Sequence, residues 1–203
     1  MQKNRKKSLK QPTGCIRIIG GQWRGRKIPV IDVEGLRPTT DRMKETLFNW
    51  LMPYLAEARV LDLFSGSGGL AFEALSRYAQ YALLCEKNMM AAQQLEQHLD
   101  LLKCKNADVY RGDSIAMLQH NCKQAFDIIF LDPPYRQALI TSCLDLIEKC
   151  QWLKPGGILF IEIEQEAPAP NLGENWLLLK EKRAGQSRFQ LWQFQHIIPG
   201  LYL

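Results

Sequence analysis

The sequence predicts an α/β fold built on a doubly wound, mainly parallel sheet. Between residues 59 and 164, short apolar runs alternate with helical patterns. This alternation is typical of parallel strands joined by helical crossovers. After that region come two strand-like runs with no helix between them, which predicts a closing antiparallel hairpin. Together the runs predict a sheet of seven strands.

The expected strands occupy Arg59–Phe64, Tyr81–Glu86, Ala107–Arg111, Phe126–Leu131, Ile158–Glu164, Trp176–Lys182 and Arg188–Phe194. The expected helices of this region occupy Gly69–Tyr78, Asn88–Leu102, Ser114–Cys122 and Ala138–Cys150. Proline and glycine at residues 154–157 predict a turn before the fifth strand.

A small extension precedes the sheet. Cys15–Val33 predicts short strands in a β-hairpin, with Gly20-Gly21 at a turn. Arg42–Leu51 predicts an amphipathic helix, because apolar residues recur on one face. Met52-Pro53 is expected to end it, since proline lacks a backbone N–H. We therefore divide the chain into a basic, disordered tail (1–13), an N-terminal extension of hairpin and helix (14–55), a main domain (56–196) and a final tail (197–203).

Composition narrows the functional classes. The 203 residues contain no apolar run of membrane-spanning length and no signal-type segment at the start, so we expect a cytoplasmic protein without a membrane partner. The six cysteines form no CxxC pair and the three histidines are scattered, so no metal site or disulfide framework is expected. Nothing in the sequence demands more than a monomer.

Positive charge is concentrated at the start of the chain. Residues 1–45 hold twelve Lys/Arg and four acids, a net charge of +8, whereas the rest of the chain totals −3. A basic front end on an acidic body indicates a polyanionic partner such as nucleic acid. For Lys3–Lys10 alone, a solubilising tail is an equal alternative. The candidate nucleic-acid contacts are Arg17, Trp23, Arg24, Arg26, Lys27 and Arg42.

A glycine turn follows the first strand of the sheet. Gly66 and Gly68 precede a helix, and glycines there let the backbone approach a ligand at the helix N-terminus. Glu86 ends the next strand, where a ribose-binding acid belongs. These features suit any adenosine-type cofactor, including NAD, and a purely structural tight turn is the alternative.

The most specific signal is Asp132-Pro133-Pro134-Tyr135, directly after a buried apolar run. The prolines cannot extend a strand, so they hold Asp132 and Tyr135 at a stiff corner past its carboxyl end, where open α/β sheets bind ligands. The Asp132 carboxylate and Pro133 carbonyl can accept hydrogen bonds from an amino group. Tyr135 can stack on a base. The alternative is a strand-ending turn with an incidental aromatic residue.

Several motifs together resemble known methyltransferases. Asp62 and Phe64-Ser65 before the glycines resemble the first motif of class I methyltransferases, and residues 132–135 resemble the (D/N)PP(Y/F) motif of amino-group methyltransferases. The whole chain over about residues 14–195 resembles the bacterial RsmD family. The motifs that carry this resemblance are Gly20-Gly21-Gln22-Trp23-Arg24-Gly25-Arg26, Arg37-Pro38-Thr39-Thr40-Asp41-Arg42, Glu45-Thr46-Leu47-Phe48-Asn49, Phe64-Ser65-Gly66-Ser67-Gly68 and Asp132-Pro133-Pro134-Tyr135.

The resemblance implies a Rossmann-like class I methyltransferase that uses S-adenosylmethionine to methylate a guanine N2 of 16S rRNA in an assembling 30S particle. It implies that Glu86 binds the ribose hydroxyls and that Asp113 binds the adenine amino group, although Asp113 also suits a helix N-terminus. The implied catalytic residues are Asp132, Pro133, Pro134 and Tyr135. The implied cofactor-binding residues are Arg37, Thr39, Thr40, Asp62, Phe64, Ser65, Gly66, Gly68, Glu86, Lys87, Asp113, Ser114 and Asp132.

Three other functions stay open: a DNA adenine methyltransferase, an NAD-dependent oxidoreductase, and a nucleic-acid-binding module without turnover. DNA methyltransferases normally carry a sizeable target-recognition region, and the segments between Gly66 and Asp132 are all assigned to the sheet and its helices. So small a recognition apparatus suits a substrate with its own shape, such as folded RNA.

Overall fold

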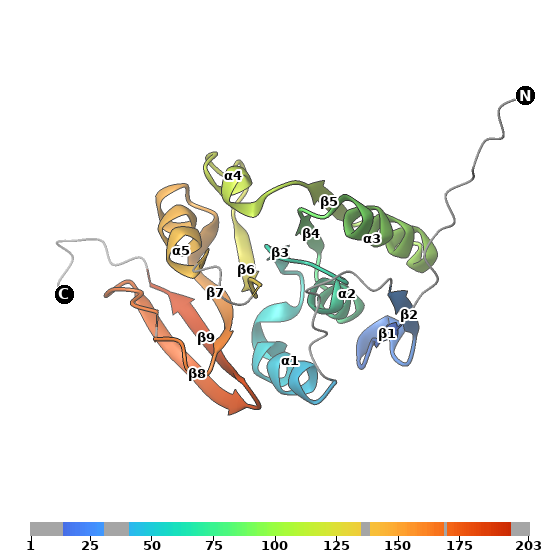
Figure 1. The fold of residues 1–203 in the computed structure, drawn as a ribbon, viewed down its shortest axis with the longest axis horizontal. Coiled ribbons are helices and arrows are strands. Elements are labelled where there is room, and N and C mark those ends of the chain that lie inside the picture. The colour runs from blue at the N-terminus through green and yellow to red at the C-terminus, as the bar shows by residue number, and fades with distance from the viewer. Residues whose placement is uncertain (1–13, 31–40, 135–138, 169, 196–203) are drawn as a thin grey trace, which may run out of the picture.

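The computed structural model describes residues 14–30, 41–134, 139–168 and 170–195, and it confirms the predicted α/β fold. The main sheet has seven strands in the order β5-β4-β3-β6-β7-β9-β8, and five of them are parallel (Figure 1). β9 runs antiparallel to β7 and to β8, as the closing hairpin requires. The strands are β3 (Arg59–Asp62), β4 (Tyr81–Glu86), β5 (Ala107–Arg111), β6 (Phe126–Leu131), β7 (Leu153–Glu164), β8 (Trp176–Ala184) and β9 (Ser187–Phe194).

Helices cover both faces of the sheet. An apolar cluster lies on each face. Because side chains alternate along a strand, Phe130 of β6 belongs to the first apolar cluster and Ile129 belongs to the second. On the first face Phe130 contacts Phe48 with the ring centroids 6.1 Å apart. On the second, Trp152 stacks on Phe126 at 6.2 Å. The helices are α1 (Asp41–Leu55), α2 (Gly69–Ser76) and α3 (Met89–Leu102), which contribute to the first cluster, and α4 (Ser114–Leu118) and α5 (Leu139–Lys149), which contribute to the second.

Three predicted boundaries were wrong by four or five residues, and the other boundaries of the helices and of the main sheet by at most two. α1 continues past Pro53 to Leu55, which is 3% exposed, so apolar burial offsets the backbone hydrogen bond that proline cannot make. α4 ends at Leu118, where the indole of Trp152 donates hydrogen bonds to the carbonyls of Leu118 and His120. β7 begins at Leu153, so the expected turn at residues 154–157 lies within an irregular stretch of the strand that includes a register shift against β6.

The N-terminal hairpin, residues 14–30, contains β1 (Gly14–Arg17), the short 3₁₀ helix η1 (Gly21–Trp23) and β2 (Lys27–Val30), with the two strands antiparallel as predicted. It is held against α2. The hydroxyl of Ser76 donates to the Gly20 carbonyl at 2.6 Å and accepts from the Trp23 N–H at 2.9 Å. The buried carboxylate of Glu73 accepts from the Ile19 N–H at 2.8 Å. A Cβ at Gly21 would lie 1.8 Å from the Ser76 carbonyl oxygen, so only glycine permits this approach.

The sheet reverses its direction of winding between β3 and β6. From β3 the chain proceeds outward through β4 to β5, and then returns to place β6 on the other side of β3. Open α/β sheets bind ligands in the crevice at such a point, beyond the carboxyl ends of the strands. Asp62 is the last residue of β3 and Asp132 directly follows β6, so the topology brings the two predicted motifs to one crevice.

Candidate active site

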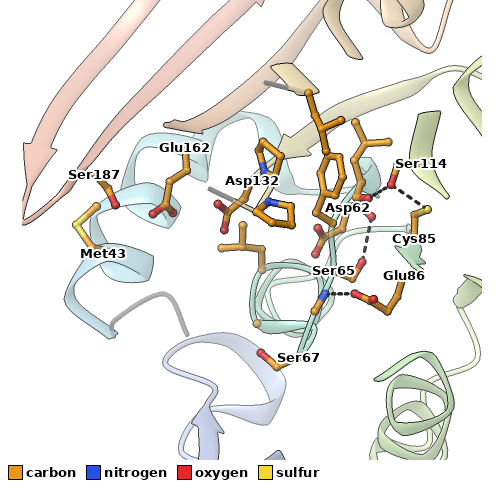
Figure 2. Close-up of a pocket in the computed structure, with 18 of the residues that line it drawn as sticks. Met43, Asp62, Ser65, Ser67, Cys85, Glu86, Ser114, Asp132, Glu162 and Ser187 are labelled. Carbon is orange, nitrogen blue, oxygen red and sulfur yellow. Dashed lines mark hydrogen bonds between the residues drawn. The ribbon is translucent and has the colours of Figure 1, made fainter. Parts of the chain in front are cut away.

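A cleft of about 1310 Å³ lies at this crevice (Figure 2). Its lining includes residues from the ends of β3, β4, β6 and β7, from the start of α1 and from the tip of the β8–β9 hairpin. Of the predicted site residues, the cleft brings together Arg42, Asp62, Phe64, Ser65, Gly66, Glu86, Lys87, Asp113, Ser114, Asp132, Pro133 and Pro134.

Three carboxylates share one face of the sheet. They are Asp62, Asp132 and Glu162. Each lies two residues after a side chain of the first apolar cluster, and residues two apart on a strand point to the same face. The three cluster residues are Val60, Phe130 and Phe160. Leu131 pairs with Ile161, so the residues that follow them, Asp132 and Glu162, lie level on neighbouring strands. Figure 2 shows all three carboxylates directed into the cleft.

Burial and neighbouring negative charges change how two of them, Asp62 and Asp132, ionise. Burial raises the pKa of Asp62 to about 7, the negative charge of Glu86 also raises it, and backbone hydrogen bonds from Ala71 and Phe64 oppose the shift. For Asp132, burial is again the main cause, and the negative charges of Glu162 and Asp62 add to it, so its pKa lies well above the ordinary value. A positive charge in the cleft would relieve this repulsion.

The glycine turn between β3 and α2 is held by side chains of the cleft. The hydroxyl of Ser65 donates to the Asp62 carbonyl at 3.0 Å. Gly68 has φ +80°, and a Cβ there would lie 2.3 Å from the ring of Phe72. Glu86 accepts the Gly66 N–H at 2.8 Å through one oxygen and the Asn88 N–H at 2.7 Å through the other. A carboxylate has about four acceptor positions, so Glu86 keeps capacity for a ligand's hydroxyl groups.

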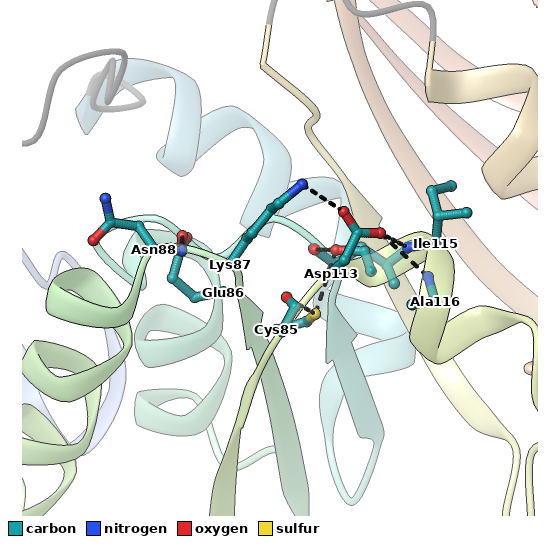
Figure 3. A network of polar contacts seen from close by, with 10 residues as sticks. Cys85, Glu86, Lys87, Asn88, Asp113, Ile115 and Ala116 are labelled. Carbon is teal, nitrogen blue, oxygen red and sulfur yellow. Dashed lines mark hydrogen bonds and ion pairs between the residues drawn. The ribbon is translucent and has the colours of Figure 1, made fainter.

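Asp113 caps a helix and forms an ion pair (Figure 3). One carboxylate oxygen accepts the N–H groups of Ile115 at 2.9 Å and Ala116 at 3.2 Å, and the other accepts from the Lys87 ammonium at 2.9 Å. The hydrogen bond from Lys87 is the main reason that the pKa of Asp113 is lowered. The helix-terminal role that the sequence left open for Asp113 is therefore present, and it holds both Asp113 and Lys87 at the cleft rim.

Ser114 supports the ends of the strands. Ser114 is buried, and its hydroxyl donates to the Leu63 carbonyl. The Cys85 sulfur lies 3.3 Å from the Ser114 hydroxyl oxygen. Burial raises the pKa of Cys85 to about 11, which keeps this thiol protonated and unreactive.

The structure adds residues that the sequence did not indicate. Glu162, Lys182, Arg183, Ser187 and Phe189 line the cleft from β7, β8 and β9. Glu162 interrupts the apolar run of β7 near its carboxyl end, and that interruption was the available signal. The residues of β8 and β9 carry no such signal, because their place at the cleft depends on how the hairpin pairs with β7.

The predicted nucleic-acid contacts divide into two groups. Arg17, Arg24, Arg26, Lys27 and Arg42 are all exposed. Trp23 is only 8% exposed and packs in the first apolar cluster, so its ring is not available to stack on RNA and we leave it out of the interface. Arg37, Thr39, Thr40 and Tyr135, and the two tails, lie outside the described residues.

Two features are absent from the described parts of the chain. There, no group of three or more His, Cys, Asp or Glu side chains is arranged to hold a metal ion. Among the same residues, no helix is long and apolar enough to cross a membrane.

Comparison with known proteins places the chain in a family. A family model described as "Conserved hypothetical protein 95" matches residues 16–193. "Ribosomal RNA small subunit methyltransferase D" of Escherichia coli (strain K12) is 46% identical over 188 residues, which span 93% of this chain and 94% of that protein. The chain belongs to the RsmD family. The protein of the same name from Haemophilus influenzae is also 46% identical, over 89% of this chain and 94% of its own length.

Solved structures agree with this membership. The E. coli protein yhhF superposes on this RsmD-family chain with a TM-score of 0.85 and 44% identity, over 90% of this chain and 99% of that one. A solved structure from H. influenzae gives a TM-score of 0.79 with 42% identity, over 90% and 100% of the two chains. The resemblance noted from the sequence motifs is confirmed.

Proposed function

We propose that this RsmD-family protein is an S-adenosylmethionine-dependent methyltransferase that modifies the exocyclic N2 amino group of a guanine in 16S rRNA. The observation that carries the proposal is the placement of the Asp132-Pro133 acceptors beside Asp62 and the glycine turn in one cleft. The names of the curated relatives support ribosomal RNA as the substrate. As part of the proposal, the protein acts as a cytoplasmic monomer on an assembling 30S particle.

The charge of the cleft favours S-adenosylmethionine over NAD. Besides burial, the negative charges of Glu162 and Asp62 raise the pKa of Asp132, and that of Glu86 raises the pKa of Asp62, as expected where buried carboxylates are short of positive charge. The pyrophosphate of NAD would add negative charge there, whereas a sulfonium is a cation. Glu86 has acceptor capacity for ribose hydroxyls. When bound, S-adenosylmethionine supplies an electrophilic methyl group.

The chain's own residues then prepare the amino group. The lone pair of an exocyclic amine is delocalised into its base, which makes the nitrogen a poor nucleophile. The Asp132 carboxylate and the Pro133 carbonyl can accept the two N–H groups and favour a pyramidal, more reactive nitrogen. Because its pKa is raised, Asp132 is also a stronger proton acceptor than an ordinary carboxylate when the methylated nitrogen loses a proton.

The fold also bears on the choice between RNA and DNA. All of the chain from β3 to β6 is used by the core strands, their helices and the short turns between them. This supports the expectation that no separate target-recognition region is inserted there. A guanine would have to leave its stack to reach the acceptors.

The deciding experiment is methyl transfer from labelled S-adenosylmethionine to 30S particles isolated from cells that lack the protein. Wild-type protein should modify one guanine N2, and duplex DNA should not be labelled. Asp132→Ala should reduce transfer by at least about 100-fold, since both hydrogen bonding and proton acceptance at the carboxylate are lost. Its affinity for S-adenosylmethionine should stay within a few-fold of wild type by calorimetry. Full activity of Asp132→Ala would refute the mechanism, and labelling of DNA alone would refute the substrate.

A further inference from the structure

The β8–β9 hairpin is a basic element in an acidic part of the chain. Residues 176–194 contain four basic residues and one acid, whereas all residues after 45 together total −3. One of the four, Arg188, is buried and donates to the Ala167 carbonyl at 2.7 Å. The remaining three, Lys180, Lys182 and Arg183, lie on β8, so the positive charge of the hairpin is displayed on its outer strand.

Two of these residues reach the cleft. Lys182 and Arg183 line it near the two-residue turn at Gly185-Gln186, together with Arg42 from the start of α1. The Lys182 ammonium donates to the Thr46 hydroxyl at 3.0 Å, which fixes the tip of the hairpin to α1. Thr46 in turn donates to the Arg42 carbonyl at 3.1 Å, so Lys182 is held within one helical turn of Arg42.

α1 also connects this tip to the N-terminal hairpin. The buried ammonium of Lys44 donates to the Arg17 carbonyl on β1, while Thr46 receives Lys182 from β8. Figure 1 shows α1 between the β1–β2 and β8–β9 hairpins. The basic residues that the sequence indicated in the N-terminal hairpin therefore face a second basic element across one helix.

Charge is distributed in two zones of the cleft. Its floor holds Asp62, Asp132 and Glu162, and the phosphates of RNA would be repelled from it. Its lining also includes the exposed Arg42 and Arg183 and the half-buried Lys182, which attract them. A neutral base can enter the floor only if the phosphates next to it are held outside.

We propose that Lys182 and Arg183, with Arg42, form a second RNA-contact site that binds backbone phosphates next to the modified nucleotide. This inference rests on the proposed function. It assigns to the β8–β9 hairpin a recognition role that the basic N-terminal residues do not cover.

The competing explanation is structural. Lys182 would serve only to tie β8 to α1, and Arg183 would be neutralised by Glu181. Arg183 lies 3.9 Å from the Glu181 carboxylate, at the limit of an ion pair, and its side chain is 59% exposed. Glu181 also accepts from Gln190 at 2.6 Å. Such an exposed pair is weak and leaves Arg183 available to a phosphate.

The test measures binding of wild-type protein and the double variant Lys182→Gln/Arg183→Gln to unmodified 30S particles over a series of salt concentrations. A plot of log K against log salt has a negative slope, and each lost phosphate contact reduces the magnitude of this slope by about 0.7 for single-stranded RNA. The double variant should therefore lose about 1.4 from the slope and about tenfold in affinity near 0.15 M salt. Affinity for S-adenosylmethionine should not change.

Two controls separate the explanations. Lys103→Gln/Lys105→Gln removes the same charge from exposed positions between α3 and β5, at the opposite edge of the sheet, and should keep the wild-type slope. Thr46→Val removes the tie to Lys182 but keeps both cations, and should also bind like wild type. The inference is overturned if the double variant matches Lys103→Gln/Lys105→Gln, or if Thr46→Val reproduces its defect. If wild-type protein neither binds nor methylates the particle, the proposed function itself has failed.

Discussion

At the scale of single residues, the proposed methyl transfer depends on the protonation of Asp132. The amino group of a base needs an ionised acceptor, and Asp132 accepts hydrogen bonds as a carboxylate only above its pKa. Burial, Glu162 and Asp62 all raise that pKa. As the pH is lowered, activity should consequently be lost at a higher pH than it would be with an ordinary aspartate.

Glu162→Gln tests this coupling. It removes one of the negative charges that raise the pKa of Asp132, so the pKa should decrease and the acidic limb of the pH–rate profile should move to lower pH. The measurement is single-turnover methyl transfer at saturating particle across the range from pH 5 to 8. Glu166→Gln, on an exposed residue just beyond β7, is the matched control. An acidic limb that stays in place in Glu162→Gln would show that Asp132 is not the titrating group.

At the scale of elements, the contact between the N-terminal hairpin and α2 matters most. Ser76 both donates to Gly20 and accepts from Trp23, so one hydroxyl serves two backbone groups of the hairpin. Burial of Ile16, Ile18 and Trp23 adds an apolar contact to the same core as the sheet. The hairpin is therefore a fixed part of the main fold and presents its basic residues in a defined position.

Ser76→Ala should reduce the free energy of unfolding by about 1–3 kcal/mol, because the buried Trp23 N–H loses its acceptor. Urea denaturation followed by circular dichroism measures the change. Ser142→Ala, on the exposed face of α5, should change stability by less than about 0.5 kcal/mol. Equal stability of the two variants would mean that the hydroxyl does not hold the hairpin.

His98 makes the same region sensitive to acid. Burial lowers its pKa to about 4, while a hydrogen bond with the backbone of Pro29 opposes the shift. Between about pH 6.5 and 4 the unfolded chain binds a proton at this residue that the native protein excludes, so stability falls as the pH decreases.

The contribution should reach about 1.4 kcal/mol per pH unit within that window. His98→Gln should abolish this part of the pH dependence in urea denaturation, whereas His120→Gln, on an exposed residue, should keep it. Asp62 and Asp132, whose pKa values are raised, act in the opposite direction, because the native protein binds their protons more readily than the unfolded chain as the pH decreases. Both variants keep these carboxylates, so their effect cancels in the comparison. Parallel curves for His98→Gln and wild type would contradict the assignment.

The elements that the sequence predicted best are those defined by local patterns. β4, β5 and β6 have the predicted bounds because each is a run of five or six residues between polar or turn residues. The ends of α4 and β7 were missed because distant groups set them, the indole of Trp152 in one case and pairing with β6 in the other. The same distinction applies to the site residues. Asp62 and Asp132 lie at the ends of strands that the sequence predicts, whereas Glu162 reaches the cleft because β7 pairs with β6.

At the scale of the whole molecule, the burial of thiols gives a global test of the fold. Cys85 and Cys143 are buried, and burial raises their pKa values to about 11 and about 12. Cys15 is exposed on β1. Native and unfolded molecules should therefore differ sharply in which cysteines react.

Brief alkylation with iodoacetamide at pH 8 should modify Cys15 first and leave Cys85 and Cys143 unmodified in the native protein. Peptide mass spectrometry identifies the sites, and denatured protein, in which all six cysteines should react, is the control. Rapid native labelling of Cys143 would contradict the packing of α5 on the sheet.

The attachment of the hairpin to α2 also has a consequence for synthesis on the ribosome. Its partners Glu73, Leu75 and Ser76 lie 53 to 56 residues later in the chain than the groups they bind. An isolated two-stranded hairpin is marginally stable in water, so residues 14–30 should become ordered only after the first β–α unit has emerged. The nascent chain would then present the basic residues of the hairpin in a fixed position only once the glycine turn after β3 has also been made.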